Sequence, residues 1–210
     1  MCGRYQRRSD KQKIAEAFHL GNVDGLAVEF APDYNAAPQS IQPVIIWDQA
    51  GGTRVLQMMF WRFLPPYVTD RKKFRLDTIN AKGETLLDSN VWRYAFLHNR
   101  CLIPIDSFVE WRHVDAKTKL PWLFGMKDGE PFALAGVYRH WRSPDGKSGM
   151  DTFAIQVRIM RWMVSSFTAT ENSPTSSPGR FRCLECRNCP RGAYWDRKHA
   201  RDHSIARDTP

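Results

Sequence analysis

The chain has 210 residues, of which 42% are hydrophobic, including eight Trp and twelve Phe, and its formal net charge is +9. This length and apolar content exclude a disordered chain and fit one domain with a well-developed core. The sequence has no apolar run of eighteen residues, which excludes a membrane helix, and no apolar stretch after the first arginines, which excludes a signal peptide. We therefore expect a soluble, cytoplasmic protein. The positive charge suggests a polyanionic partner, although more than half of the excess lies in residues 153–210.

The first five residues, Met1-Cys2-Gly3-Arg4-Tyr5, place a cysteine directly after the initiator Met. Removal of Met1 leaves Cys2 with an α-amine and a thiol on adjacent carbons. The amine, with a pKa of about 7.7–8.0, condenses with an aldehyde, and the thiol, with a pKa of about 8.5, then closes a thiazolidine ring. Gly3 keeps the approach open for a bulky electrophile. The plainer interpretation is that Cys2 is simply an early cysteine.

A short helix is predicted next. Ser9 followed three residues later by Gln12 forms a capping box, and Ile14 and Phe18 lie on one face before Gly21 ends the pattern. This predicts a helix of about eleven residues. The proline-rich stretch 30–38 then favours extended, turn-rich backbone that lies against another element.

A hairpin and a basic cluster follow. Residues 43–47 and 54–61 read as two strands joined by the turn at 48–52. Beyond Pro65 and Pro66, residues 71–75 hold four basic side chains around Phe74. Such a cluster is either a solvated loop or part of a groove that binds single-stranded nucleic acid.

The middle of the chain alternates between helical and strand patterns. Residues 86–97 have helical spacing, and residues 101–111 read as one strand that carries Asp106 and Glu110 among apolar neighbours. Each carboxylate there is either paired in a structural role or used for proton transfer. Further short strands are expected at 122–124, 132–141 and 151–157. The predicted fold is an α+β, β-rich single domain with a barrel-like core and a few helices.

Five motifs in one order resemble the SOS response-associated peptidase (SRAP) family. They span roughly residues 1–157, which we take as the core domain. The motifs are Met1-Cys2-Gly3-Arg4-Tyr5, Tyr34-Asn35-Ala36-Ala37-Pro38, Phe60-Trp61, Ile79-Asn80-Ala81-Lys82-Gly83-Glu84-Thr85, and Cys101-Leu102-Ile103-Pro104 running into Phe108-Val109-Glu110-Trp111.

The resemblance implies a protein that crosslinks through its N-terminal cysteine to abasic sites in single-stranded DNA during the DNA damage response. It assigns Cys2 as the nucleophile, Asn80 as a polar group at the reacting centre and Glu110 as an acid–base residue. It further implies no cofactor, no metal, no membrane partner and a monomer that is nucleoid-associated in a bacterium. The residues that it places against DNA are Arg4, Asn35, Trp61 and Lys82, the last replacing the more usual Arg with a point charge.

The resemblance breaks at a fourth catalytic residue, a His whose position falls here on Thr168. Codons AGT TTC ACG GCA ACC GAR, which encode residues 166–171, give Phe-His-Gly-Asn-Arg when read from the last base of the Ser166 codon. We therefore predict that residues 158–210 form a divergent or out-of-frame, disordered tail, with the frame change between about residues 156 and 166. Without the His, crosslinking is expected to persist in reduced form while its reversal suffers, since Thr does not titrate near neutral pH.

Two further hypotheses belong to other classes. The first is a cysteine peptidase of N-terminal-nucleophile type that uses Cys2 with Glu110 and Asn80, for example to process its own N-terminus. The second is a non-catalytic protein that binds nucleic acid or zinc. The tail supplies possible zinc ligands at Cys183, Cys186, Cys189, His199 and His203, although this spacing matches no recognised zinc finger.

Overall fold

A computed structural model describes residues 3–21, 28–157 and 167–171. This part of the chain is rich in strands and has two short α-helices and one 3-10 helix, which confirms the predicted α+β, β-rich domain. None of its helices is long and apolar enough to cross a membrane. The elements in order are β1 (Tyr5–Arg7), α1 (Lys11–Phe18), β2 (Asp33–Ala36), β3 (Ile41–Asp48), β4 (Thr53–Trp61), β5 (Asn80–Lys82), η1 (Gly83–Thr85), α2 (Arg93–His98), β6 (Arg100–Ile105), β7 (Ser107–His113), β8 (Lys119–Met126), β9 (Phe132–Arg142), β10 (Gly149–Val157) and β11 (Phe167–Glu171).

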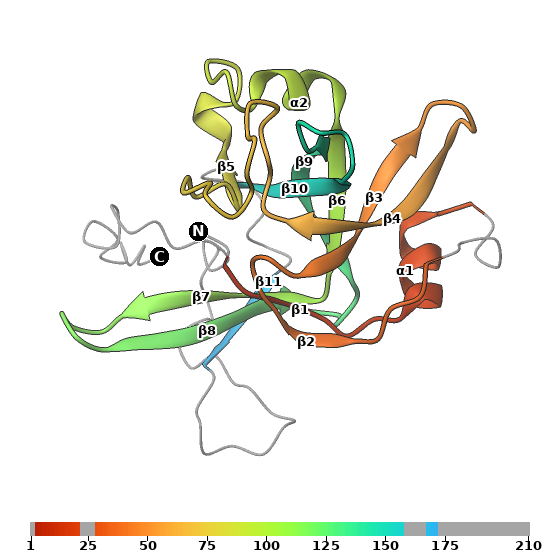
Figure 1. The fold of residues 1–210 in the computed structure, drawn as a ribbon. Helices are drawn as coiled ribbons and strands as arrows, with labels where there is room; N and C mark the ends of the chain where they lie inside the picture. Colours follow the sequence, from red (N-terminus) through yellow and green to blue (C-terminus); the bar gives the residue numbers. More distant parts are fainter. Residues whose placement is uncertain (1–2, 22–27, 158–166, 172–210) are drawn as a thin grey trace.

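The upper part of the molecule in Figure 1 is a closed barrel. Its strands follow the order β4-β3-β6-β9-β10, and β10 closes the ring by pairing in parallel with β4. Strand β5 adds to the other part of β10, also in parallel, with Asn80 opposite Ile155. Closure leaves no free edge along the ring, and it brings β5 next to the end of β4.

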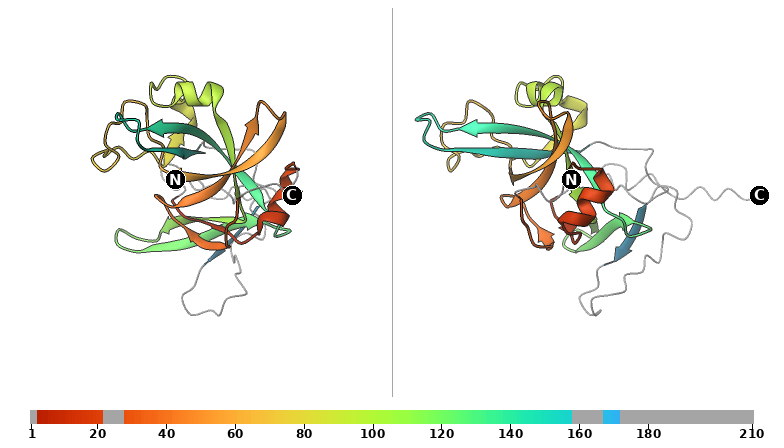
Figure 2. Two further views of the ribbon diagram at one scale, coloured as in Figure 1. Left: turned by 45° about the vertical axis from the view of Figure 1, so that its right-hand side comes forward. Right: turned by 90° about the vertical axis from the view of Figure 1, so that its right-hand side faces the viewer.

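A second, five-stranded sheet follows the order β11-β8-β7-β1-β2 and lies beneath the barrel in the left view of Figure 2. The largest group of buried side chains joins the two sheets. It includes Tyr5 and Ala36 from the second sheet together with Trp61, Ile103 and Phe153 from the barrel. Because this core is continuous, the first strand of the chain is fixed against the barrel interior.

The predicted hairpin is confirmed as β3 and β4, which pair from Ile41 opposite Phe60 to Asp48 opposite Thr53. Asp48 organises the turn, since its side chain accepts hydrogen bonds from the backbone N–H groups of Ala50 and Gly51, both at 3.1 Å. Gly52 has a φ of 61°, which glycine adopts without strain. The turn residues and the alternation of apolar and polar residues therefore favour the same hairpin, which explains why both strands could be predicted from the sequence.

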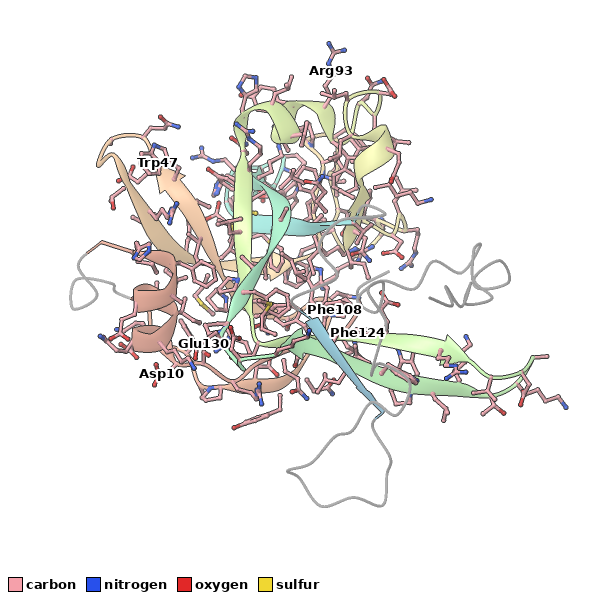
Figure 3. All side chains as sticks on the ribbon, turned by 180° about the vertical axis from the view of Figure 1, so that it is seen from behind. Asp10, Trp47, Arg93, Phe108, Phe124 and Glu130 are labelled. Atoms are coloured by element: carbon pink, nitrogen blue, oxygen red, sulfur yellow. The ribbon has the colours of Figure 1, made fainter. Side chains whose placement is uncertain are left out.

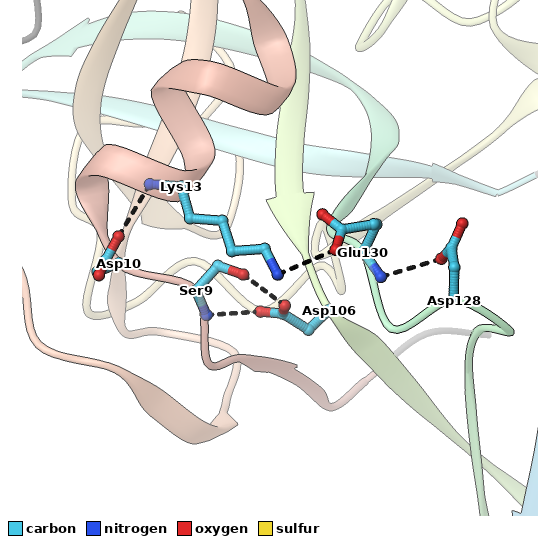
Figure 4. Close-up of polar contacts among 6 residues, drawn as sticks. All are labelled: Ser9, Asp10, Lys13, Asp106, Asp128 and Glu130. Carbon is cyan, nitrogen blue, oxygen red and sulfur yellow. Dashed lines mark hydrogen bonds and ion pairs between the residues drawn. The ribbon is translucent and has the colours of Figure 1, made fainter.

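The helix near the N-terminus is shorter than predicted and is capped by a different residue. It spans eight residues, and its N-cap is Asp10, whose side chain accepts from the N–H of Lys13 at 2.8 Å. Ser9, the predicted cap, instead donates its hydroxyl to Asp106 (Figure 4). The helix ends at His19 in the left-handed conformation, two residues before Gly21. Ser9 therefore does not cap the helix, because its hydroxyl is bound to the distant carboxylate of Asp106.

The stretch 101–111 is two strands and not one. Asp106 interrupts it, so that β6 stays in the barrel while β7 enters the second sheet. Asp106 is 4% exposed, and its side chain accepts from the N–H of Arg8 at 2.6 Å. It also accepts from the N–H of Ser9 at 2.9 Å and from the Ser9 hydroxyl at 2.6 Å (Figure 4). Of the two roles left open for this carboxylate, the structural one applies.

An Asp106→Ala substitution should lower the free energy of unfolding by about 3 kcal/mol, because it leaves the buried N–H of Ser9 and the partly buried N–H of Arg8 without their acceptor. Asp106→Asn should cost about 1 kcal/mol, since its amide oxygen still accepts from both N–H groups while the Ser9 hydroxyl turns to accept from the amide. Urea unfolding measures both variants. Equal stabilities of the Ala variant and the parent protein would contradict the assignment.

The helical pattern at 86–97 is only partly helical. The 3-10 helix η1 ends at Thr85, and α2 begins at Arg93. Ser89 lies between them, where its hydroxyl accepts from the N–H of Val91 at 3.3 Å. Its backbone carbonyl accepts from the N–H groups of Trp92 and Arg93. Such local side-chain bonding competes with helix continuation, so the predicted single helix was wrong over its first half.

Candidate functional site

The first described residues lead into the second sheet, one strand in from its edge strand β2. Strand β1 runs between β2 and β7, with Tyr5 opposite both Ala36 and Phe108. Beyond Tyr5 the pairing with β7 continues, because the N–H of Val109 donates to the carbonyl of Arg4 at 2.9 Å. One further step in this antiparallel register brings Gly3 opposite Glu110. Cys2, the predicted nucleophile, precedes Gly3 and lies outside the described residues.

Glu110 is half-buried on β7 and lies directly opposite Trp122 of β8. Side chains alternate along a strand, so Glu110 shares its face with Phe108 and Arg112. Phe108 stacks on Phe124 with ring centroids 5.3 Å apart (Figure 3).

On the other side of Glu110 along the strand, the guanidinium of Arg112 lies 5.6 Å from the centroid of the Trp122 ring. Along this face of β7, Glu110 therefore lies between an aromatic residue, Phe108, and a basic residue, Arg112. The sequence had given Glu110 two apolar neighbours, Phe108 and Trp111. Trp111 belongs to the opposite face and is 46% exposed. Arg112 was missed because the predicted strand ended at Trp111, and Trp122 was missed because its proximity depends on the β7–β8 register.

Asn80 opens β5 and is connected to β1 through Trp61. The Trp61 ring lies 5.1 Å from the Tyr5 ring, and its indole N–H donates to the carbonyl of Ile79 at 3.1 Å. The same carbonyl accepts from the N–H of Ile155 at 3.0 Å. These contacts fix the backbone beside Asn80 relative to the strand that carries the N-terminus.

Trp61 does not fit its expected role of stacking on a nucleotide. It is 0% exposed, because Tyr5 packs against it and Phe153 stacks on it with ring centroids 6.2 Å apart. A base can reach this ring only after core side chains move. Trp61 is therefore a core residue that supports Asn80, and the expectation is corrected.

A Trp61→Phe variant should be less stable by about 2 kcal/mol, since the smaller ring leaves a space in the core and lacks the indole N–H donor. Its affinity for single-stranded DNA should match that of the parent protein at temperatures where both are folded. Thermal unfolding and fluorescence anisotropy measure the two quantities. A tenfold loss of DNA affinity with unchanged stability would return Trp61 to the DNA interface.

The three remaining predicted DNA contacts lie on elements around this region. Lys82 is exposed at the end of β5, two residues beyond Asn80 and on the same face of the strand. Asn35 is exposed on β2, next to β1. Arg4 is half-buried, and its guanidinium donates to the carbonyl of Gly3 at 3.1 Å. Their contacts with DNA remain predictions.

Cys101, the one cysteine within the described residues, is buried in the barrel. Burial raises the pKa of its thiol well above its usual range, so this cysteine stays protonated and is a poor nucleophile. The described residues also contain no group of three or more His, Cys, Asp or Glu side chains arranged to hold a metal ion. The possible zinc ligands of the tail lie outside the described residues.

Thr168, at the position where the resemblance expects His, lies in β11 opposite Gly125 of β8. This strand falls within the region that the sequence assigned to the tail, and it extends the sheet that contains β7 and Glu110. Sequencing the gene tests the out-of-frame hypothesis, and codons at 166–171 that do not encode the shifted peptide would reject it.

The described residues thus form a closed barrel joined to a five-stranded sheet. Residues 1–172 match the family model described as SOS response associated peptidase (SRAP), and the chain belongs to this family.

Several curated proteins resemble the chain. Over 148 residues it is 38% identical to the abasic site processing protein YoqW of Bacillus subtilis, covering 70% of this chain and 63% of YoqW. It is 36% identical, also over 148 residues, to YobE of the same species, which has the same description, covering 70% of this chain and 65% of YobE. The chain thus spans a little under two thirds of the length of these relatives.

Two solved structures share the fold. A protein from Bacteroides thetaiotaomicron superposes with a TM-score of 0.63 at 18% identity, covering 82% of this chain and 78% of that one. A protein from Bordetella bronchiseptica gives a TM-score of 0.62 at 19% identity, covering 86% and 80%. At these identities the likeness supports the fold alone.

Proposed function

We propose that this chain is an abasic-site processing protein that forms a covalent adduct through Cys2 with the aldehyde of an abasic site in single-stranded DNA. The observation that carries the proposal is the pairing of β1 with β7, whose register, continued past Arg4, brings Gly3 opposite Glu110. The proposal requires Cys2 to reach that carboxyl, and consecutive Cα atoms are only about 3.8 Å apart. The relatives YoqW and YobE are described as abasic site processing proteins, which supports the same class of substrate.

The proposed reaction needs no redox partner. The α-amine of Cys2 adds to the sugar aldehyde, and loss of water gives an imine. The thiolate then attacks the imine carbon, a C–S bond forms, and the nitrogen takes up a proton to complete the thiazolidine. The second attack is intramolecular, so it gains the rate advantage of a held geometry. The product carbon is saturated, and it no longer activates the sugar for elimination of its 3′ phosphate; the adduct thereby shields the DNA from strand scission.

Glu110 and Asn80 have separate roles in this proposal. Glu110 transfers protons to and from the sugar oxygens as the ring opens and water leaves, which is work for a half-buried carboxyl next to an apolar ring. Asn80, held by β10 and by the Trp61 contact with Ile79, binds the reacting centre. Lys82 and Arg4 bind the phosphate backbone of the DNA. Because such contacts do not read the bases, the protein should have only a weak preference for DNA sequence.

A denaturing gel tests the proposal. Protein shown by mass spectrometry to lack Met1 is incubated with a single-stranded oligonucleotide that contains one abasic site. We expect a heat-stable band of lower mobility, and no such band with the intact oligonucleotide. Absence of the band at a tenfold excess of protein would reject the proposal, as would a band formed by protein that retains Met1.

The family description as a peptidase favours one second candidate, an N-terminal-nucleophile peptidase that uses the same residues. The two functions differ in their product. A peptidase releases a cleaved peptide, with Met1 as the simplest substrate, and leaves an abasic oligonucleotide unchanged. Mass spectrometry of the protein before and after incubation, together with the gel, distinguishes them.

A further inference from the structure

The basic loop, residues 71–75, presents charge without its aromatic ring. Arg71, Lys72, Lys73 and Arg75 are exposed, whereas Phe74 is partly buried and packs against the cluster formed by Leu64, Val68 and Trp141. Phe74 is therefore engaged in the protein core and does not offer a stacking platform to a base. What the loop presents to solvent is a row of cations.

The loop is held in one shape from two sides. Arg62 donates to the carbonyl of Phe74, and its guanidinium lies 5.3 Å from the centroid of the Phe74 ring. Asp70 caps the start of the loop, since its side chain accepts from the N–H of Lys72 at 2.8 Å and its carbonyl accepts from the N–H of Phe74 at 3.1 Å. A loop fixed in this way loses little entropy when it binds a ligand.

The loop is anchored directly beside Asn80. Arg62 follows Trp61, whose indole holds the carbonyl of Ile79. Between them and β5, Phe63 and Thr78 exchange two hydrogen bonds, at 3.2 Å and 2.6 Å. Residues 61–63 therefore run along the segment that leads into Asn80. In Figure 1 the connection between β4 and β5 lies on the same side of the molecule as the start of the described chain, opposite α1.

We infer that the basic loop is a second binding surface for the backbone of single-stranded DNA, which contacts nucleotides flanking the one that reacts. This rests on the proposed function for the reacting end of the site. Among the four cations of the loop, the structure pairs only Lys73 with a carboxylate of the described residues, Asp70 at 4.0 Å. The remaining cations, Arg71, Lys72 and Arg75, are left to neutralise phosphates. Such contacts bind independently of sequence and release counterions.

The test is the triple variant Arg71→Gln, Lys72→Gln, Arg75→Gln, which keeps Phe74, Asp70 and Arg62. Anisotropy of a labelled, undamaged single-stranded oligonucleotide gives the affinity at several salt concentrations. We expect about tenfold weaker binding at low salt, and a salt slope that is smaller by about two, from roughly 0.7 per lost phosphate contact. At saturating protein, the yield of adduct with the abasic oligonucleotide should equal that of the parent protein.

The matched control also removes three positive charges, through Lys11→Gln, Lys13→Gln and Lys127→Gln. Lys11 and Lys13 lie on α1, and Lys127 is exposed directly after β8. The control should bind DNA with nearly the parent salt slope. Equal slopes for the two triple variants would overturn the inference, because net charge alone would then explain the effect. A parent protein that binds through the loop but forms no adduct would overturn the proposed function and leave the loop assignment standing.

Discussion

A Cys2→Ala variant is expected to form no heat-stable adduct with abasic single-stranded DNA. Its α-amine still condenses with the aldehyde, but without the thiol the reaction stops at an imine, which water hydrolyses. Sodium borohydride reduces an imine to a stable amine, so the variant should form a band only when borohydride is present. The parent protein should form its band with or without borohydride. Denaturing gels with both treatments measure the difference.

The matched control for this prediction is Cys101→Ala. Cys101 is buried in the barrel, where burial raises the pKa of its thiol, so its removal should leave adduct formation unchanged. Cys2→Ser provides a second comparison, because its hydroxyl is a far weaker nucleophile than a thiolate. A heat-stable band from Cys2→Ala without borohydride would show that another group supplies the second bond, and the thiazolidine would have to be abandoned.

Local sequence predicted those elements whose determinants are local. The β3–β4 hairpin follows from alternation and from the Asp48 turn, and the structure has both. The α1 cap and the division between β6 and β7 were missed for one shared reason. Asp106 binds Ser9 across 97 residues of sequence, which removes Ser9 from the cap position and bends the chain at the same time. No periodicity in either segment contains that contact.

The sequence motifs predicted which residues belong to the candidate site, but they did not predict which side chains surround those residues. Motifs named Glu110 and Asn80, and the structure places each on a strand that is tied to β1. The error at Trp61 arose because an aromatic residue in a motif serves equally well as a stacking surface or as core. Packing between Tyr5 and Phe153 decides for core. Trp122 reaches the surroundings of Glu110 only through the register of the β7–β8 hairpin, which residue types alone do not specify, whereas Arg112 lies on the same strand just beyond the predicted end of the strand at 111.

A Glu110→Gln variant should crosslink between about 10² and 10⁴ times more slowly than the parent protein, which is the usual contribution of a positioned acid–base group. Gln has nearly the same shape as Glu, so the packing between Phe108 and Arg112 should persist while proton transfer is lost. Single-turnover gels at saturating protein give the rate constant, and anisotropy with undamaged DNA gives the affinity, which should stay within about threefold. Comparing the rate constant with the affinity separates an effect on the crosslinking step from an effect on DNA binding.

The control for Glu110→Gln is Glu130→Gln, a change of the same chemistry at an exposed carboxylate whose partner, Lys13, lies on α1 (Figure 4). Exposed ion pairs contribute little, so this variant should match the parent protein in both rate and stability. If Glu110→Gln also crosslinks at the parent rate while its unfolding midpoint falls, Glu110 is a structural carboxylate like Asp106. The proton transfer must then come from Cys2 itself or from solvent. In that case the register that brings Gly3 opposite Glu110 has no catalytic consequence.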